Sequence, residues 1–205
     1  MTTRAATLAD ATIPWASGAQ AARYARAAIL VAAGAALTAL SAQLSWQAPW
    51  TTVPYTGQTA AVLLVGTVLG SRLGVASMAL YLLVGALGVG VFSGGSSGLF
   101  DEAGALSGSV GYLVGFIVAA GLVGRLAERG WDRTPVQAAG LMVLGNLVIY
   151  AIGVPVLAWT LGMTAGDALF YGAIVFVPWD AFKVLVAAGL LPLAWRAVGS
   201  RPEAR

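Results

Sequence analysis

The sequence predicts an all-α integral membrane protein with six transmembrane helices. Of its 205 residues, 59% are hydrophobic and only 9% are charged, and the mean hydropathy is +0.85. A soluble domain carries about 25% charged residues, so too few charges remain here to cover a surface in contact with water. Several apolar segments reach the roughly 20 residues that a helix needs to cross a bilayer core. They are apolar on all sides, which favours helices over the alternating strands of a barrel.

The composition also excludes several classes of site. The chain has no cysteine and no histidine, which excludes disulfides and thiolate metal sites and removes the commonest general base. Its single lysine, Lys183, is not part of a G-x-x-x-x-G-K-[ST] loop, so no phosphate-binding site of that kind exists. The charged residues lie between apolar stretches instead of forming a cluster, which disfavours nucleic-acid binding. We therefore expect neither an enzyme nor a bound metal or cofactor.

Six apolar segments together form a membrane domain with a shorter part of the chain on each side. A cytoplasmic extension over residues 1–26 precedes a membrane domain over 27–197, and a cytoplasmic tail over 198–205 follows. Spans two and three are separated only by residues 71–74, so a re-entrant hairpin is an alternative there. The predicted spans are Ala27–Leu44, Pro54–Ser71, Gly74–Phe92, Ser107–Leu126, Pro135–Leu157 and Val177–Ala197.

The arginines predict the orientation, because positive charges near membrane spans stay in the cytoplasm. If both termini are cytoplasmic, all ten arginines lie inside, and the outer loops carry only Asp101, Glu102 and Asp167. The chain is therefore expected to be a multi-pass protein of the inner (cytoplasmic) membrane. The arginines are Arg4, Arg23, Arg26, Arg72, Arg125, Arg129, Arg133, Arg196, Arg201 and Arg205.

Two ionisable residues, Asp180 and Lys183, fall inside the last span near its outer end. A charge at the centre of a membrane helix costs roughly 2.5 to 3.5 kcal/mol on insertion scales, so such groups usually face a cavity or a partner. Their i, i+3 spacing places both on one helix face, and Pro178 suits the first turn. One interpretation is a ligand site that opens outward. The alternative is structural, with Asp180 complementing the helix terminus and Lys183 reaching toward the interface.

Other polar side chains lie in the same outer half or near the middle of the membrane. Their amides and hydroxyls can both donate and accept, and the tyrosines add flat apolar faces. For Asn146 and Tyr150, hydrogen bonding between helices is an equal alternative to ligand contact. The candidate ligand-binding residues are Thr56, Gln58, Tyr112, Asn146 and Tyr150.

Small residues recur every four positions on the first span, at Ala28, Ala32 and Ala36. Such a ridge lets helices approach closely in lipid, either within the protein or at a partner subunit. A separate feature is the run from Ser93 to Gly98, a flexible linker between spans three and four that forms either a lid or a simple connector.

Four ordered motifs resemble the signatures of the BioY family, the biotin-specific S components of energy-coupling factor transporters. The family usually has V-P-V-T-L-Q-T where this chain has Tyr55 and Gly57, and G-P-T-G-G-Y over residues 107–112. It also tends to have proline at Gly90 and glycine at Trp179. The motifs are VPYTGQT at 53–59, YLLVGALGVGVF at 81–92, GYLVGF at 111–116 and VPWDAFK at 177–183.

The resemblance implies a six-helix S component that takes up biotin from outside. Its usual partners are a transmembrane T component and two ATPases, although some members are thought to work without them. The family's D-x-x-K contacts the vitamin and corresponds to Asp180 and Lys183, and its glutamine corresponds to Gln58. The A-x-x-x-A face that meets the T component corresponds to Ala32 and Ala36. The alternatives are a solitary biotin transporter, an S component for another small vitamin and, less favoured, a channel or structural membrane protein.

Overall fold

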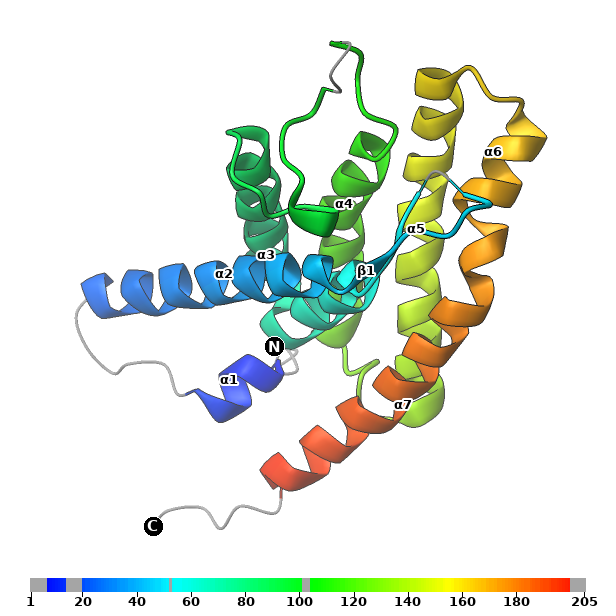
Figure 1. Cartoon of the computed structure of the whole chain (residues 1–205). Coiled ribbons are helices and arrows are strands. Elements are labelled where there is room, and N and C mark those ends of the chain that lie inside the picture. Colours follow the sequence, from blue (N-terminus) through cyan, green and yellow to red (C-terminus); the bar gives the residue numbers. More distant parts are fainter. Residues whose placement is uncertain (1–6, 14–19, 52, 101–103, 200–205) are drawn as a thin grey trace, which may run out of the picture.

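Helices make up most of the structure. The computed structural model describes residues 7–13, 20–51, 53–100 and 104–199 (Figure 1). In these residues five helical segments are long and apolar enough to cross a membrane, which confirms the predicted helical membrane protein. The short helix α1 (Leu8–Thr12) precedes them. The five segments are α2 (Gln20–Gln43), α3 (Gln58–Ala86), α4 (Val110–Ala127), α5 (Pro135–Leu161) and the run of α6 (Ala165–Gly172), the 3-10 turn η2 (Ile174–Phe176) and α7 (Val177–Gly199).

Predicted spans two and three form the single element α3, which is broken at Gly70. Gly70 has φ 83° and ψ 174°, a left-handed conformation that residues with a side chain rarely adopt. The two arms fold back on each other so closely that a Cβ on Gly74 would lie 2.8 Å from the Cα of Gly66. At 1.5 Å per residue the arm before Gly70 is only about 18 Å long, against a bilayer core of about 30 Å. The break therefore precedes the turn predicted at residues 71–74.

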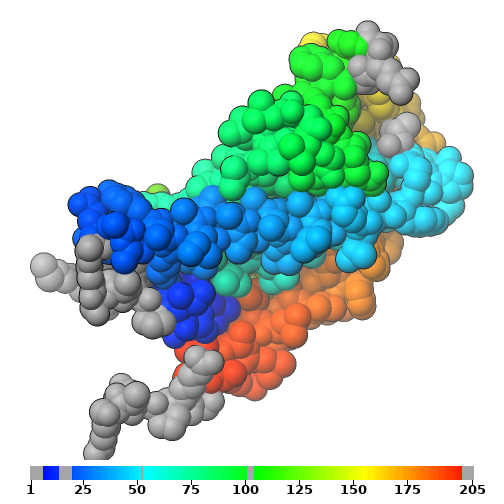
Figure 2. All heavy atoms as spheres, turned by 60° about the vertical axis from the view of Figure 1, so that its left-hand side comes forward, coloured from blue at the N-terminus to red at the C-terminus, as the bar shows by residue number. Residues whose placement is uncertain are grey.

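The bundle is built around α4, which packs between α3 and α5. Helix α2 lies against α3, and α7 lies against α5 (Figure 1). Side chains such as Leu63, Met78, Leu141 and Ile149 are fully buried where these helices meet. Figure 2 shows α2 as an uncovered band across one face of the molecule, so one side of this helix is free for lipid or a partner.

The connection between α2 and α3 forms a short hairpin that reaches across to the last helices. Strand β1 (Ser45–Trp46) pairs antiparallel with β2 (Tyr55–Thr56). The Thr51 hydroxyl donates to the Tyr171 carbonyl oxygen at 2.8 Å, and the Tyr55 hydroxyl donates to the Val175 carbonyl oxygen at 2.9 Å. This connection ties the start of α3 to the segment that leads into α7.

Within the predicted extension over residues 1–26, the described residues 7–13 and 20–26 include helical segments. Helix α2 begins at Gln20, not at Ala27, and α1 packs beneath α3 and α7 with Leu8 buried in the core. Arg26 holds the end of α1, because its Nη2 donates to the carbonyl oxygens of Ala9 at 3.1 Å and Ile13 at 2.8 Å. It also pairs with Asp10 at 3.3 Å.

Candidate binding site

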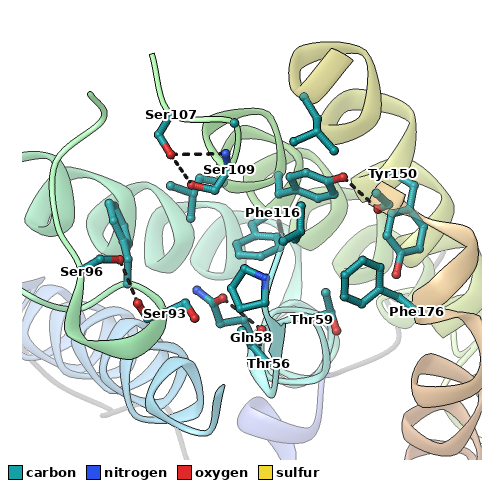
Figure 3. A pocket seen from close by; sticks show the side chains of 18 of the residues that line it. Thr56, Gln58, Thr59, Ser93, Ser96, Ser107, Ser109, Phe116, Tyr150 and Phe176 are labelled. Carbon is teal, nitrogen blue, oxygen red and sulfur yellow. Dashed lines mark hydrogen bonds between the residues drawn. The ribbon is translucent and has the colours of Figure 1, made fainter. Parts of the chain in front are cut away.

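A cavity of about 320 Å³ lies where the starts of α3, α4 and α7 converge with α5 and the loops around residues 93–96 and 107–109. This volume falls in the range of small-molecule sites. Its walls carry aromatic and aliphatic side chains together with a few polar groups (Figure 3). Of the described residues that line it, Asp180 and Lys183 are the only charged ones.

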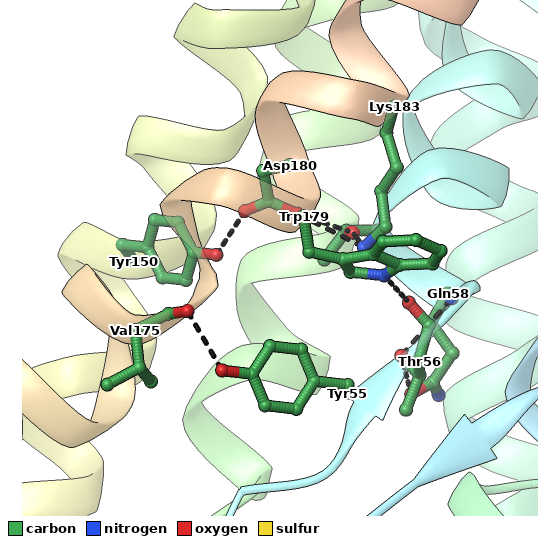
Figure 4. Close-up of polar contacts among 9 residues, drawn as sticks. Tyr55, Thr56, Gln58, Tyr150, Val175, Trp179, Asp180 and Lys183 are labelled. Atoms are coloured by element: carbon green, nitrogen blue, oxygen red, sulfur yellow. Dashed lines mark hydrogen bonds and ion pairs between the residues drawn. The ribbon is translucent and has the colours of Figure 1, made fainter. Parts of the chain in front are cut away.

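Asp180 and Lys183 form an ion pair in the first turns of α7, as their spacing predicts. Lys183 Nζ lies 3.1 Å from Asp180 Oδ1 and donates to Thr59 Oγ1 at 2.7 Å. The Tyr150 hydroxyl of α5 donates to Asp180 Oδ2 (Figure 4). Asp180 is only 6% exposed, so this carboxylate is compensated by a cation and a phenol instead of water. The ring of Trp179 lies 5.5 Å from the ammonium.

Thr56 and Gln58 are fixed at the start of α3 by a chain of hydrogen bonds. The Thr56 hydroxyl donates to Gln58 Oε1 at 3.1 Å and accepts from the Gln58 backbone N–H at 3.2 Å. Gln58 Nε2 donates to the Tyr81 hydroxyl, which donates to the Val91 carbonyl oxygen at 3.1 Å. The amide is therefore held in one orientation before any ligand binds.

Aromatic rings form one wall of the cavity. Tyr112 and Tyr150 meet edge to face with centroids 6.4 Å apart. The Tyr112 hydroxyl donates to the Gly172 carbonyl oxygen at 2.8 Å, so its proton is already used. Its ring lies so close to α5 that a Cβ on Gly153 would come within 2.5 Å of it. Tyr112 thus offers a ligand its ring more than its hydroxyl.

The opposite part of the cavity carries four serines in place of charges. In Figure 3 they lie on the side away from Tyr150 and Phe176. Ser107 and Ser109 place their hydroxyls 3.0 Å apart, and the Ser96 hydroxyl donates to the Ser93 carbonyl oxygen at 2.9 Å. We call these four residues, Ser93, Ser96, Ser107 and Ser109, the serine end.

The structure brings most of the candidate ligand-binding residues together, with one exception. Asn146 lines a separate cavity of about 110 Å³, where its Oδ1 is buried without a hydrogen-bond partner. Lys183 lines both cavities. The six candidates that line the larger cavity are Thr56, Gln58, Tyr112, Tyr150, Asp180 and Lys183.

The three alanines of the predicted ridge lie far from this chemistry, on the exposed side of α2. Ala28, Ala32 and Ala36 are all exposed, and none lines the cavity. They are separated on the helix by buried positions such as Leu30 and Ala35, which pack inward. The ridge is therefore available to another molecule, and docking there stays a prediction.

Sequence reasoning missed several cavity residues. Thr59, which lines the cavity, lies within the quoted motifs, and so does Tyr81, which lies outside the cavity lining and accepts a hydrogen bond from Gln58, so the motifs contained a signal for both. The serine end lies in loops with no periodicity, and the sequence predicts only a lid or a connector for the run from Ser93 to Gly98. Part of that run forms the 3-10 turn η1 (Ser93–Gly95), and Ser93 and Ser96 face the cavity.

The whole arrangement can hold a ligand of mixed character. Its buried charged pair is electrically neutral overall, its walls are aromatic and aliphatic, and hydroxyls line the far end. Among the described residues, no group of three or more acidic, histidine or cysteine side chains could hold a metal ion. This chemistry suits recognition of a small, mostly apolar molecule with polar groups at both ends.

Comparison with known proteins decides the family. The model of the BioY family matches residues 8–200. The chain belongs to the BioY family. It is 38% identical over 143 residues to "Biotin transporter BioY" of Rhizobium etli, covering 66% of this chain and 74% of that protein. It is 37% identical over 155 residues to "Biotin transporter BioY" of Thermotoga maritima, covering 74% of this chain and 86% of that one.

The fold is also that of a solved structure. A 2.1 Å crystal structure of the S-component for biotin from an ECF-type ABC transporter matches with a TM-score of 0.73 and 18% identity. The match covers 87% of this chain and 95% of that chain. The S-component fold predicted from the motifs is therefore present in this member of the family.

Proposed function

We propose that this chain is the biotin-binding membrane subunit of an energy-coupling factor transporter. The observation that carries the proposal is the buried Asp180–Lys183 pair at one end of an aromatic cavity of about 320 Å³. Biotin has a ureido ring with two N–H donors and a carbonyl acceptor, joined to a carboxylate by an apolar chain. A carboxylate, an ammonium and apolar walls are the groups that such a molecule requires. Relatives named as biotin transporters support the same ligand.

Binding is tested directly with the purified full chain in detergent. A ligand that binds only the folded state raises the melting temperature, by an amount that grows with ligand concentration. We expect biotin to raise the melting temperature in this way and thiamine, a vitamin of different chemistry, to leave it unchanged. A melting temperature that does not respond to biotin would overturn the proposed function.

The proposal extends to the position of the chain in the inner membrane. We infer six membrane segments with both termini in the cytoplasm, counting the two arms of α3 separately although the arm before Gly70 is shorter than the bilayer core. The ten arginines of the sequence support that orientation. A reporter fused after Arg205 should read as cytoplasmic, and one inserted at Ser97 should read as external. The opposite result at both positions would reverse the orientation, and the opposite result at one position alone would contradict the six-span topology.

The partners belong to the proposal as well. The chain has no nucleotide-binding loop, so accumulation of ligand against a gradient needs energy from elsewhere. A T component with two ATPases would supply it, docking on the exposed alanines of α2. The alternative is a solitary transporter, which would move biotin without those subunits.

A further inference from the structure

The two ends of the cavity differ in charge and in exposure. At one end Asp180 is 6% exposed and its ion pair with Lys183 is buried. At the other, Ser96 and Ser109 are exposed and Ser93 and Ser107 are half-buried. Figure 3 shows the labelled serines on one side of the cavity and Tyr150, the partner of Asp180, on the other. A ligand with two different polar groups therefore has a preferred direction.

The charged end suits a neutral polar group and not a carboxylate. The negative charge of Asp180 is already balanced by Lys183 at 3.1 Å, with Tyr150 as a further donor. A second carboxylate there would leave an uncompensated negative charge in a buried site, which is strongly unfavourable. A ureido group adds no charge. It can donate an N–H to Asp180 and accept the third N–H of Lys183, since only two of the three are used.

The serine end cannot distinguish a carboxylate from an amide by charge. None of the described residues that line this end is cationic, because the one cation of the cavity is Lys183. A hydroxyl donates and accepts equally well, so it can bond a carboxylate oxygen, an amide carbonyl or an amide N–H. The exposure of Ser96 and Ser109 also leaves room for a substituent to extend out of the cavity.

We propose that this chain binds biotin whose carboxyl group is joined in an amide, including biotinyl-lysine, as well as free biotin. The inference rests on the proposed function and adds the orientation of the ligand and the class of substrates. The ureido ring occupies the charged end, and the carboxyl group or its amide lies among the serines. The chain would then also take up biotin that is still attached to a lysine after release from a protein.

The experiment is a calorimetric titration of the purified full chain with four ligands. They are biotin, biotinamide, biotinyl-lysine and a biotin methylated on a ureido nitrogen. The affinity for biotinamide should be within about threefold of that for biotin, and the affinity for biotinyl-lysine within about tenfold. The methylated analogue should bind about a hundredfold more weakly than biotin, or weaker still. A hundredfold loss with biotinamide alone would place the carboxylate at Lys183 and overturn the inference while the proposed function stands. Failure of biotin itself to bind would overturn both.

A substitution at the serine end provides an independent test. Ser109→Lys adds a cation where the carboxyl group is placed, so it should make biotin bind about tenfold more tightly than biotinamide. Ser97→Lys is the matched control, because Ser97 is exposed in the neighbouring loop and does not line the cavity. Equal affinity for both ligands in the Ser109→Lys variant, with normal binding of biotin, would contradict the placement.

Discussion

At the scale of single residues, we expect the ion pair in the cavity to contribute both to ligand binding and to the stability of the fold. The Asp180 carboxylate accepts hydrogen bonds from Lys183 and Tyr150, so removal of one partner changes the environment of the others. Lys183→Met keeps the apolar stem but leaves Asp180 without its cation and the ligand without a donor. We expect a loss of biotin affinity of about 2 to 5 kcal/mol, the range found when one member of a buried charge pair is truncated.

Calorimetry measures that loss, and a second variant separates binding from folding. In Asp180→Asn with Lys183→Met, no unpaired buried charge remains, so the melting temperature without ligand should recover toward that of the unaltered chain. Biotin affinity should stay low, since both ligand contacts are gone. Unchanged affinity in the single variant would mean that the pair is structural only.

Asp132, in the loop between α4 and α5, makes the stability of the fold depend on pH. It is fully buried, accepts a hydrogen bond from Trp195 Nε1 at 2.7 Å, and its Oδ1 has no partner. Burial raises the pKa of the Asp132 carboxyl, an effect that the Trp195 hydrogen bond and the nearby Arg133 oppose. The folded state therefore favours the protonated acid. Its contribution to stability is full below the ordinary pKa of an aspartate and is lost as the pH rises through the raised pKa.

Asp132→Asn should therefore stabilise the fold at pH 8 and not in acid. The amide keeps an acceptor for Trp195 and removes the charge, so the free energy of unfolding at pH 8 should rise by about 1 kcal/mol. Thermal unfolding of the unaltered chain and of the Asp132→Asn variant between pH 4 and pH 8 measures the difference in their stability. A difference that is the same at every pH, or that grows in acid, would show that the charge of Asp132 is not the cause.

At the scale of elements, the break in α3 lets the two arms of this helix pack closely against each other. Gly70 permits the reversal, and Glu128 of the loop after α4 caps the second arm by accepting from the Ser71 N–H at 2.8 Å and hydroxyl at 2.7 Å. Gly70→Ala forces a side chain into the left-handed region, where its Cβ would lie 3.0 Å from both Thr7 and Glu128. We expect a destabilisation of about 1 to 3 kcal/mol.

The control for Gly70→Ala is Gly140→Ala in α5. Gly140 is helical and a Cβ there would meet no atom within 4 Å, so alanine should be neutral or stabilise by about 0.5 to 1 kcal/mol. Tryptophan fluorescence during thermal unfolding in one detergent compares the two. Equal melting temperatures would show that the conformation of Gly70 carries no strain for alanine.

The sequence predicted most helices and the charged pair, because hydropathy and the i, i+3 spacing depend only on local order. It did not separate Asn146 from Tyr150, since i, i+4 residues share a helix face until the neighbouring helices are known. In the structure Tyr150 points at Asp180 while Asn146 faces the smaller cavity. The serine end was likewise beyond prediction, because loop residues meet only through the tertiary fold.

At the scale of the whole molecule, binding and assembly lie on different surfaces. The cavity lies among α3, α4, α5 and α7, whereas the exposed alanines belong to α2, a helix that is uncovered on one side (Figure 2). Replacing Ala32 and Ala36 by leucine should hold a partner helix away without touching the cavity. Biotin binding should therefore persist, while a co-expressed T component should no longer be recovered with the chain.

Ala151→Leu is the control for that experiment, because Ala151 is an exposed alanine on α5. It should leave recovery of the T component unchanged. Undiminished assembly of the Ala32 and Ala36 variant would exclude this face as the docking surface. Failure of the unaltered chain to bind any T component would favour the solitary transporter.

The most direct measurement is an experimental structure of the chain with biotin bound. Density for biotin should fill the cavity between the serine end and the ion pair, with the ureido ring within hydrogen-bonding distance of Asp180 and Lys183. Biotin located elsewhere on the molecule, with this cavity unchanged, would contradict the assignment of the site.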